Sequence, residues 1–248
     1  MLKLSVFAVL GSVFLLISCS KDDDPTPTPP PAGDPYMAMN AGATRDFERT
    51  VNNPPSPPES YRVTTTNRDT VVGSRTYRVF ESTGGPNQYF NQSGADYYTF
   101  ADVGGALQGV LLENLYLSTS QNAGASWNQN FNNITIPGIT GTVSGTLTNK
   151  IEAKGLTYTV PGFATYDSVI RVSSTVNNIT ATVEIAPGVP FPVSIPANQI
   201  YTNIQSYYAP RVGMVHNTSI ISLDIDVMGF QYQDSSNVTT KLTATSIP

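Results

Sequence analysis

The second half of the chain alternates apolar and polar residues with a period of two, the spacing of a β-strand with one buried and one wet face. The clearest run is 221–227, in which Ile221, Leu223, Ile225 and Val227 alternate with Ser222, Asp224 and Asp226. Residues 238–247 form the last run, which we expect to close the sheet. No segment shows the period of about 3.6 residues that marks an amphipathic helix.

Shorter runs of the same kind occupy 61–66, 70–72 and 75–81, and Gly73-Ser74 predicts a hairpin turn between the last two. The mostly apolar run 110–117 predicts a central strand, because a strand covered on both faces needs few polar residues. The chain also holds 19 Gly, 19 Pro and 13 Tyr, a composition typical of strands and turns. These signals predict an all-β fold: a single domain with a curved antiparallel sheet of hairpins, as a half-barrel, a barrel or a sandwich.

Charge limits the classes of partner. The formal net charge is -5 and the sequence pI is about 4.7, so the chain lacks the basic surface that nucleic acid requires. The same charge disfavours electrostatic docking on anionic lipid. Cys19 is the single cysteine of the 248 residues, so the chain can form no internal disulfide. We expect no nucleic-acid partner and a core stabilised by packing.

The N-terminus has the layout of a secretory signal peptide. Lys3 precedes an apolar run, 4–15, that is too short to span a bilayer. The motif Leu16-Ile17-Ser18-Cys19 that follows resembles the lipobox of bacterial lipoproteins. This resemblance implies cleavage after residue 18 and attachment of diacylglycerol and a further acyl chain such as palmitate at Cys19, which would anchor the protein to a membrane.

The residues after Cys19 carry a second signal. The run Ser20-Lys21-Asp22-Asp23-Asp24 resembles the acidic export signal of Bacteroidota-type lipoproteins, which implies the outer membrane and its exterior face; the alternative is a solvated charge run. Pro-rich segments follow at 25–35 and 52–58 and favour extended polyproline II. We therefore predict a signal peptide at 1–18, a lipidated, acidic and then Pro-rich tether at 19–58, and the β domain at 59–248.

Two later motifs resemble features of an uncharacterised family of Bacteroidota lipoproteins. They are Tyr166-Asp167-Ser168-Val169-Ile170-Arg171-Val172 and Tyr207-Tyr208-Ala209-Pro210-Arg211-Val212-Gly213-Met214-Val215. Similar chains are described as half-barrels of the kind seen in the lipoprotein carriers LolA and LolB, which implies a curved antiparallel sheet. Where that pattern has Gly this chain has Arg211, whose Cβ resists a positive φ and leaves the turn geometry open.

Candidate catalytic groups are few. His216, the single histidine, follows the Gly213 turn, and no Ser stands in a Gly-x-Ser-x-Gly context, so we expect a surface loop histidine. Asp224 and Asp226 lie two apart on one strand face, with carboxylates about 7 Å apart. That spacing is compatible with an acid/base pair or a calcium site. The same spacing occurs on the solvent-exposed face of any amphipathic strand, and we adopt this interpretation of Asp224 and Asp226.

Aromatic side chains offer candidate ligand contacts. Trp127, Tyr207 and Tyr208, with Tyr97 and Tyr98, could line a platform for a glycan or a peptide, or simply pack the sheet. Thr70 and Ser168 stand in Asp-Ser/Thr-aliphatic triplets that resemble the O-glycosylation site of Bacteroidota exported proteins.

Three classes of function remain open. The first is a surface-anchored bacterial lipoprotein with a non-catalytic binding or envelope-associated role, which meets the membrane through its lipid and binds an unidentified ligand or protein. The second is a carrier of a lipid or hydrophobic ligand in a β half-barrel cavity. The third is a hydrolase or calcium site at Asp224 and Asp226. The first interpretation is preferred, with no catalytic residues, metal or cofactor.

Overall fold

A computed structural model describes residues 35–104, 107–134, 141–186, 189–227 and 230–248 of the chain. The signal peptide and the residues 19–34 expected to be lipidated and acidic lie outside the described residues. The elements are β1 (Thr44–Asn53), β2 (Glu59–Val72), β3 (Arg75–Ser82), β4 (Gln88–Ser93), β5 (Asp96–Gly104), β6 (Leu107–Ser118), β7 (Ser126–Ile134), β8 (Gly141–Thr159), β9 (Thr165–Ala186), β10 (Val189–Ser194), the 3-10 turn η1 (Ala197–Gln199), β11 (Ile200–Ala209), β12 (Gly213–Val227) and β13 (Phe230–Ser246).

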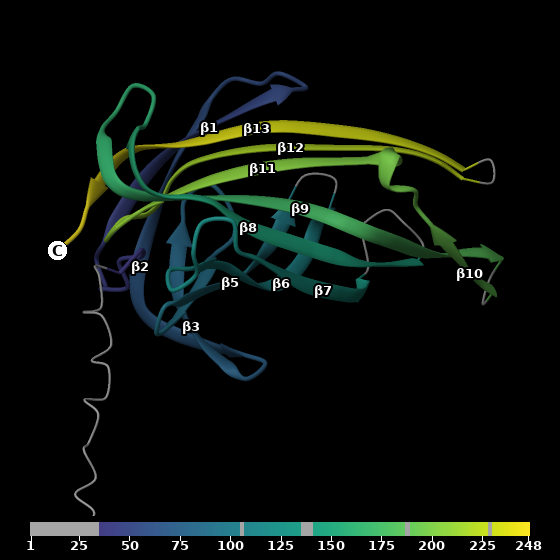
Figure 1. Cartoon of the computed structure of the whole chain (residues 1–248), viewed down its shortest axis with the longest axis horizontal. Coiled ribbons are helices and arrows are strands. Elements are labelled where there is room, and N and C mark those ends of the chain that lie inside the picture. Colours follow the sequence, from purple (N-terminus) through teal and green to yellow (C-terminus); the bar gives the residue numbers. More distant parts are fainter. Residues whose placement is uncertain (1–34, 105–106, 135–140, 187–188, 228–229) are drawn as a thin grey trace, which may run out of the picture. The chain divides into compact units, whose positions relative to one another are not determined.

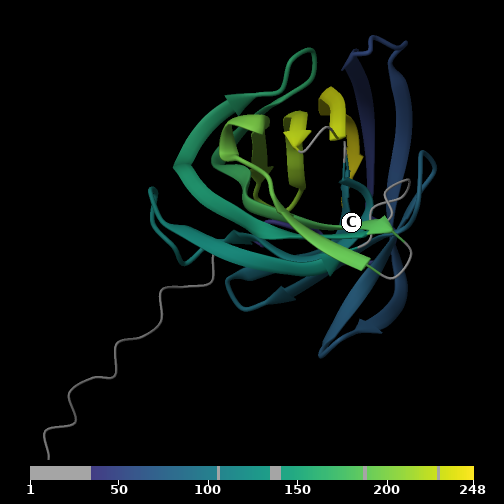
Figure 2. The ribbon, with the colours of Figure 1, turned by 90° about the vertical axis from the view of Figure 1, so that its right-hand side faces the viewer.

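The strands form one antiparallel sheet that curves into a nearly closed barrel (Figures 1 and 2). Its order is β6-β5-β4-β3-β2-β1-β13-β12-β11-β9-β8-β7, and β10 pairs with β9 off this path. Most neighbours are consecutive hairpin partners, as the meander of turns in the sequence predicts. The first and last strands also pair, with Thr44 opposite Ser246. The predicted all-β antiparallel fold is confirmed, in its barrel form.

The sheet begins earlier than the predicted boundary at Glu59. Residues 44–53, assigned to the tether from sequence, form β1, which pairs with both β13 and β2. Phe47 is buried in the core and stacks on Tyr61 of β2 with ring centroids 5.4 Å apart. The boundary at 59 is therefore wrong, because β1 turns arginines as well as apolar side chains inward and so lacks a plain apolar alternation.

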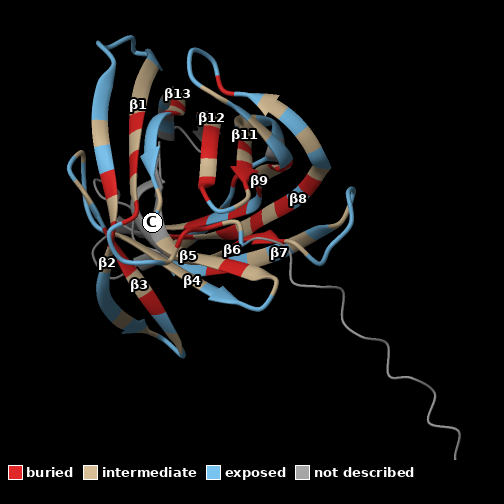
Figure 3. Cartoon of the chain, turned by 90° about the vertical axis from the view of Figure 1, so that its left-hand side faces the viewer, coloured by how far each residue is buried: buried red, intermediate tan, exposed pale blue. Residues whose placement is uncertain are grey.

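The alternation of buried and exposed residues predicted for β12 is confirmed for the residues whose side chains are described. Ile221 and Leu223 are buried, whereas Asp224 is exposed. Across the sheet, buried residues recur along strands that succeed one another around a ring (Figure 3). The apolar run 110–117, however, lies in β6 at an end of the sheet order and not at its centre, so that prediction is wrong.

The barrel is closed between β6 and β7 by side chains. The indole Nε1 of Trp127 donates to the Leu115 carbonyl at 2.6 Å, and the Leu115 N–H donates to Oε1 of Gln129 at 3.3 Å. The fully buried Asn149, on β8, also reaches β6: its Nδ2 donates to the Leu115 carbonyl at 3.1 Å and to Oδ1 of Asn114 at 2.9 Å. These bonds satisfy backbone groups that a regular ladder would otherwise pair. We call this junction the seam.

One end of the barrel is crossed by residues 35–43, which precede β1. The Tyr36 N–H donates to the Tyr97 hydroxyl of β5, and the Tyr36 hydroxyl donates to the Ser168 carbonyl of β9. Met37, on the same segment, is buried in the core. Because the segment bonds to strands in different parts of the ring, it lies across this end of the barrel. No helix within the described residues has the length and apolar character needed to cross a membrane.

The turn between β11 and β12 tolerates the arginine that departs from the resembled pattern. Arg211 has a φ of 64° and Gly213 a φ of 99°, so both adopt the left-handed region. The Arg211 N–H donates to the Pro35 carbonyl, which supports a conformation that costs a non-glycine residue on the order of 1 kcal/mol. The turn is thus fixed by the segment that crosses the barrel end.

Candidate functional site

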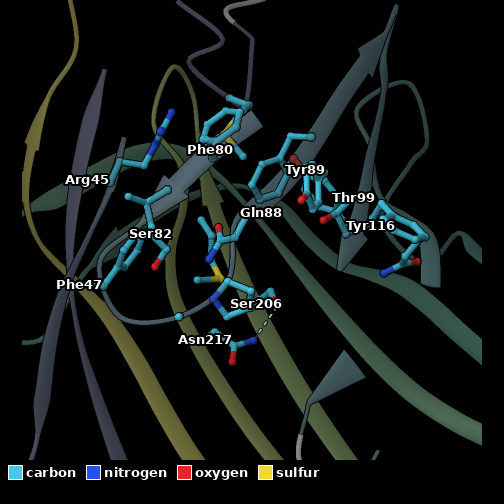
Figure 4. Close-up of a pocket in the computed structure, with 18 of the residues that line it drawn as sticks. Arg45, Phe47, Phe80, Ser82, Gln88, Tyr89, Thr99, Tyr116, Ser206 and Asn217 are labelled. Atoms are coloured by element: carbon cyan, nitrogen blue, oxygen red, sulfur yellow. Dashed lines mark hydrogen bonds between the residues drawn. The ribbon is translucent and has the colours of Figure 1, made fainter. Parts of the chain in front are cut away.

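The barrel contains a cavity of about 1020 Å³ (Figure 4). Its lining comes from strands all around the sheet: Arg45 and Phe47 from β1, Phe80 from β3, Tyr116 from β6 and Ser206 from β11. The strand curvature positions these side chains, because alternate residues of each strand point to the same face. Thus the cavity is built from positions far apart in the sequence.

The floor of the cavity consists of four aromatic rings and one arginine. We define it as Arg45, Phe80, Phe90, Tyr116 and Tyr208. The four aromatic rings follow one another in edge-to-face and tilted contacts. The ring centroids lie 4.8 Å apart for Phe80 and Phe90, and 6.0 Å apart for Phe90 and Tyr116. Tyr116 and Tyr208 are 5.2 Å apart. Such contacts stabilise the rings against one another and leave a broad apolar surface facing the cavity.

A polar wall, formed by Ser174, Ser206 and Asn217 of β9, β11 and β12, also lines the cavity. Nδ2 of Asn217 donates to Oγ of Ser206 at 2.9 Å (Figure 4). Ser206 is buried, whereas Ser174 and Asn217 are half-buried. The cavity therefore offers both apolar contact and hydrogen-bonding groups.

Arg45 is the buried charge of the floor, with a relative exposure of 2%. Its Nε donates to the Val212 carbonyl at 2.6 Å, its Nη2 to the Ala38 carbonyl at 3.0 Å and its Nη1 to Oγ1 of Thr65 at 3.3 Å. Burial lowers the pKa of Arg45 to about 10, which leaves the guanidinium charged at neutral pH. Neutral acceptors and the Phe80 ring, whose centroid lies 5.4 Å from the guanidinium carbon, solvate this cation, since no ion pair joins it to a carboxylate in the described chain.

The floor also contains a hydroxyl that lacks a hydrogen bond. Oη of Tyr116 is buried and has no partner among the described residues. Burial, together with Tyr208 and Tyr97, raises the pKa of Tyr116 well above its ordinary value, so the phenol is protonated and can donate. Burial raises the pKa of Tyr208 to about 12, but a hydrogen bond with Ser206 favours its ionised form. Tyr116 is thus the unsatisfied donor of the floor.

The rim, at the solvent-facing part of the lining, comprises Arg49 and residues 84–87. Gly85, Pro86 and Asn87 are exposed, and the Arg49 side chain is 43% exposed. Nη2 of Arg49 binds Oε2 of Glu59 at 2.5 Å, but its Nε is buried without a hydrogen-bond partner in the described chain. The rim therefore holds a cation that is shared with Glu59 and keeps further N–H donors.

Of the aromatic residues proposed from sequence as ligand contacts, the structure places Tyr208 in the cavity lining. Tyr207 points to the opposite face of β11, where its ring stacks on Tyr158 with centroids 4.0 Å apart. Trp127 lies at the seam, half-buried. Tyr97 receives the Tyr36 N–H, and Tyr98 lies under the Arg75 guanidinium, 3.5 Å from its ring centroid.

The two candidate glycosylation residues lie in strands. Thr70 is half-buried in β2, opposite Tyr77 of β3. Ser168 is exposed in β9 with a φ of 58°, and its carbonyl accepts the Tyr36 hydroxyl. Both assignments stay predictions.

The aspartate pair does not form a described site. Oδ1 of Asp224 accepts from Nε2 of Gln233 at 3.3 Å, on an exposed part of the sheet. Asp226 occupies the next position on the same face of β12, opposite Gln231, but its side chain is not among those described. In the described part of the chain, no three His, Cys, Asp or Glu residues gather as metal ligands would.

His216 is not in a surface loop, so that expectation is wrong. It lies in β12 and is only 9% exposed, because it is covered by the rings of Tyr158 and Tyr207. Its Nδ1 is hydrogen bonded to the Tyr158 hydroxyl. Burial, and then the charge of Lys241, lower the pKa of His216. The neutral imidazole packs in this outer cluster, away from the cavity.

Sequence reasoning missed the cavity residues Arg45, Arg49, Phe80 and Tyr116. The signal that could have revealed the first two is the i, i+2, i+4 spacing of Arg45, Phe47 and Arg49, which turns both arginines and the ring to one face. For Phe80 and Tyr116 we find no local signal that separates a cavity-lining ring from a core ring.

No protein-family model matches the chain, and no curated protein matches it either. Among solved structures, the crystal structure of a "putative lipoprotein" from Parabacteroides distasonis aligns with a TM-score of 0.44 and 10% sequence identity. The alignment covers 86% of this chain and 99% of that one. Similarity at this level carries no argument about function. The structure itself defines an antiparallel β-barrel with an internal cavity.

Proposed function

We propose that this protein is a lipid-anchored, non-catalytic binding protein of the bacterial envelope that holds a ligand with an apolar body in its barrel. The observation that carries the proposal is the cavity of about 1020 Å³, a space that the side chains of this wide barrel leave open and that a ligand can occupy. The aromatic floor suits an apolar body, and the polar wall suits a few oriented polar groups. This combination is usual in small-molecule sites of about 300–1,000 Å³.

We further propose that Cys19 carries the anchor and that the acidic run 22–24 directs the protein to the exterior face of the outer membrane. The support is the order of apolar run, lipobox-like motif and acidic residues in the sequence. Stable attachment by acyl chains requires at least two of them, which lipidation of an N-terminal cysteine supplies. The cavity would then be held near the cell surface.

Replacing Cys19 by Ala should remove the protein from the membrane fraction. Fractionation and carbonate extraction of cells measure this, and retention of the variant in the membrane would contradict the anchor.

Replacing Asp22, Asp23 and Asp24 by Ala should keep the protein anchored but protect it from protease added to intact cells. Equal digestion of this variant and the wild type would show that the run is only solvated charge.

Filling the cavity should weaken ligand binding. Ser206 is buried in the polar wall, so Ser206→Trp places an indole inside the barrel. We expect the full chain carrying Cys19→Ser to bind the neutral fluorescent probe N-phenyl-1-naphthylamine saturably, and Ser206→Trp to weaken that binding by about tenfold or more.

The matched control is Gln205→Trp, which adds the same ring to the opposite face of β11 and should bind like the parent. Thermal unfolding shows whether each variant is folded. Absence of saturable binding in the parent chain would contradict the proposal. Equal affinities of the two tryptophan variants would also contradict it, because the probe would then lie elsewhere.

A further inference from the structure

Among the described side chains that line the cavity, two carry a positive charge and none carries a negative charge. Arg45 and Arg49 belong to the lining, whereas no Asp or Glu with a described side chain does, although the whole chain holds 18 acidic and 13 basic residues. Charges of one sign in a cleft with low-dielectric walls concentrate the field and attract the opposite charge. The cavity thus has the electrostatics of an anion site within an acidic protein.

The two arginines contribute in different ways. Arg45 is sealed in the floor, and its three nitrogens already donate to Val212, Ala38 and Thr65, so it acts on a ligand through its field. Arg49 lies four residues further along β1, on the same face as Arg45 and at the rim. Glu59 binds Nη2 of Arg49, and the Nε–H of Arg49 is enclosed without a partner in the described chain, so a ligand would bind the remaining, accessible N–H groups of the guanidinium.

Two residues of the cavity lining have polar atoms without a hydrogen-bond partner among the described residues, Tyr116 in the floor and Arg49 at the rim. Five buried side-chain polar atoms of the described chain lack a hydrogen-bond partner, and two of them, Nε of Arg49 and Oη of Tyr116, belong to the cavity lining. Both atoms can donate, and a buried donor without an acceptor costs roughly 1–3 kcal/mol. Both donors are enclosed by the protein, so an oxygen acceptor of a bound molecule would satisfy them only after the side chains around them shift.

We propose that the ligand is an amphipathic carboxylic acid, whose carboxylate binds Arg49 at the rim and whose apolar body lies over the aromatic floor. This inference rests on the proposed function and adds the chemical class of the ligand. A singly charged carboxylate fits the rim because Arg49 already shares its charge with Glu59 and offers its remaining N–H donors. Arg45 adds a second positive charge deeper in the cavity.

The test compares a long-chain acid with its neutral counterpart. The full chain carrying Cys19→Ser is titrated at neutral pH with the fluorescent fatty acid cis-parinaric acid and with its methyl ester, which differ in charge but not in the apolar body. We expect the acid to bind about tenfold or more tightly than the ester, as a charge-assisted hydrogen bond would give. Added salt should reduce the difference, because the rim is partly exposed.

Two substitutions should move the acid preference in opposite directions. Arg49→Gln removes the cation and should abolish most of the preference, whereas Glu59→Gln removes the competing carboxylate and should increase it. Arg62→Gln is the control: Arg62 pairs with Asp46 on the outer face and is 56% exposed, so this variant should behave like the parent. Thermal unfolding confirms that each variant is folded.

Each outcome decides a different claim. Equal affinities for acid and ester would overturn the carboxylate inference and leave the proposed binding function in place. No saturable binding of either molecule would contradict the proposed function itself. An acid preference that survives Arg49→Gln would overturn the placement of the carboxylate at the rim.

Discussion

Arg45→Met is expected to lower the free energy of unfolding by about 2 to 4 kcal/mol. The change removes the donors that satisfy the buried Val212 carbonyl and help to satisfy the Ala38 carbonyl. Arg45→Met also removes the desolvation cost of a buried cation that has no carboxylate partner in the described chain. This gain in free energy offsets part of the loss. The net effect is large since Arg45 joins the crossing segment 35–43, β2 and the β11–β12 turn.

Equilibrium unfolding in urea measures the change by linear extrapolation. The control is Arg62→Met, which breaks an exposed ion pair with Asp46 and should cost no more than about 1 kcal/mol. Limited proteolysis should in addition cut the Arg45→Met variant within 35–43, once the segment loses its attachment. Similar losses of stability in the two variants would contradict the role assigned to Arg45.

Asn149→Asp is expected to cost about 2 to 4 kcal/mol, although the two side chains have nearly the same shape. The amide of Asn149 donates to the Leu115 carbonyl and to Oδ1 of Asn114, while its Oδ1 accepts from Oγ of Ser174 at 2.6 Å. A carboxylate keeps the acceptor but loses both donors, and it places a buried negative charge beside two oxygens. The seam should therefore weaken at β6.

The matched control for this variant is Asn128→Asp. Asn128 is exposed on β7, and its Oδ1 accepts from Oγ1 of Thr148 at 2.9 Å, a bond that a carboxylate keeps. Its cost should stay within about 0.5 kcal/mol, as is usual for surface substitutions. Urea unfolding of both variants at neutral pH makes the comparison. Equal stabilities would show that the bonds of Asn149 contribute little to barrel closure.

The fold class could be predicted because strand patterning is local. In β12, Ile221 and Leu223 are buried and Asp224 is exposed, as alternation alone requires. The first strand could not be predicted in this way, since Arg45 faces inward and is stabilised by a carbonyl 167 positions away. No window of the sequence around β1 contains that partner, so the segment resembles a charged tether.

The cavity was beyond local reasoning for a related reason. Whether Phe80 or Tyr116 lines a hollow or packs a filled core depends on the curvature of the whole sheet and on which side chains face them from other strands. His216 shows the same dependence: two rings from β8 and β11 cover it, although its own neighbours in sequence look like a turn. Only Tyr208, proposed from composition, was placed in the lining.

The pairing of the first strand with the last has a consequence for how the protein is made. A ribosome delivers the N-terminus first, so β1 emerges long before β13, and Oγ1 of Thr245 bonds to the Thr44 carbonyl across 201 positions. Until the final residues arrive, one edge of β1 stays unpaired beside the open edge of β12. Unpaired edges recruit other strands. The nascent chain therefore needs protection until it is complete, and a message shortened by a few dozen codons would yield a product prone to aggregate.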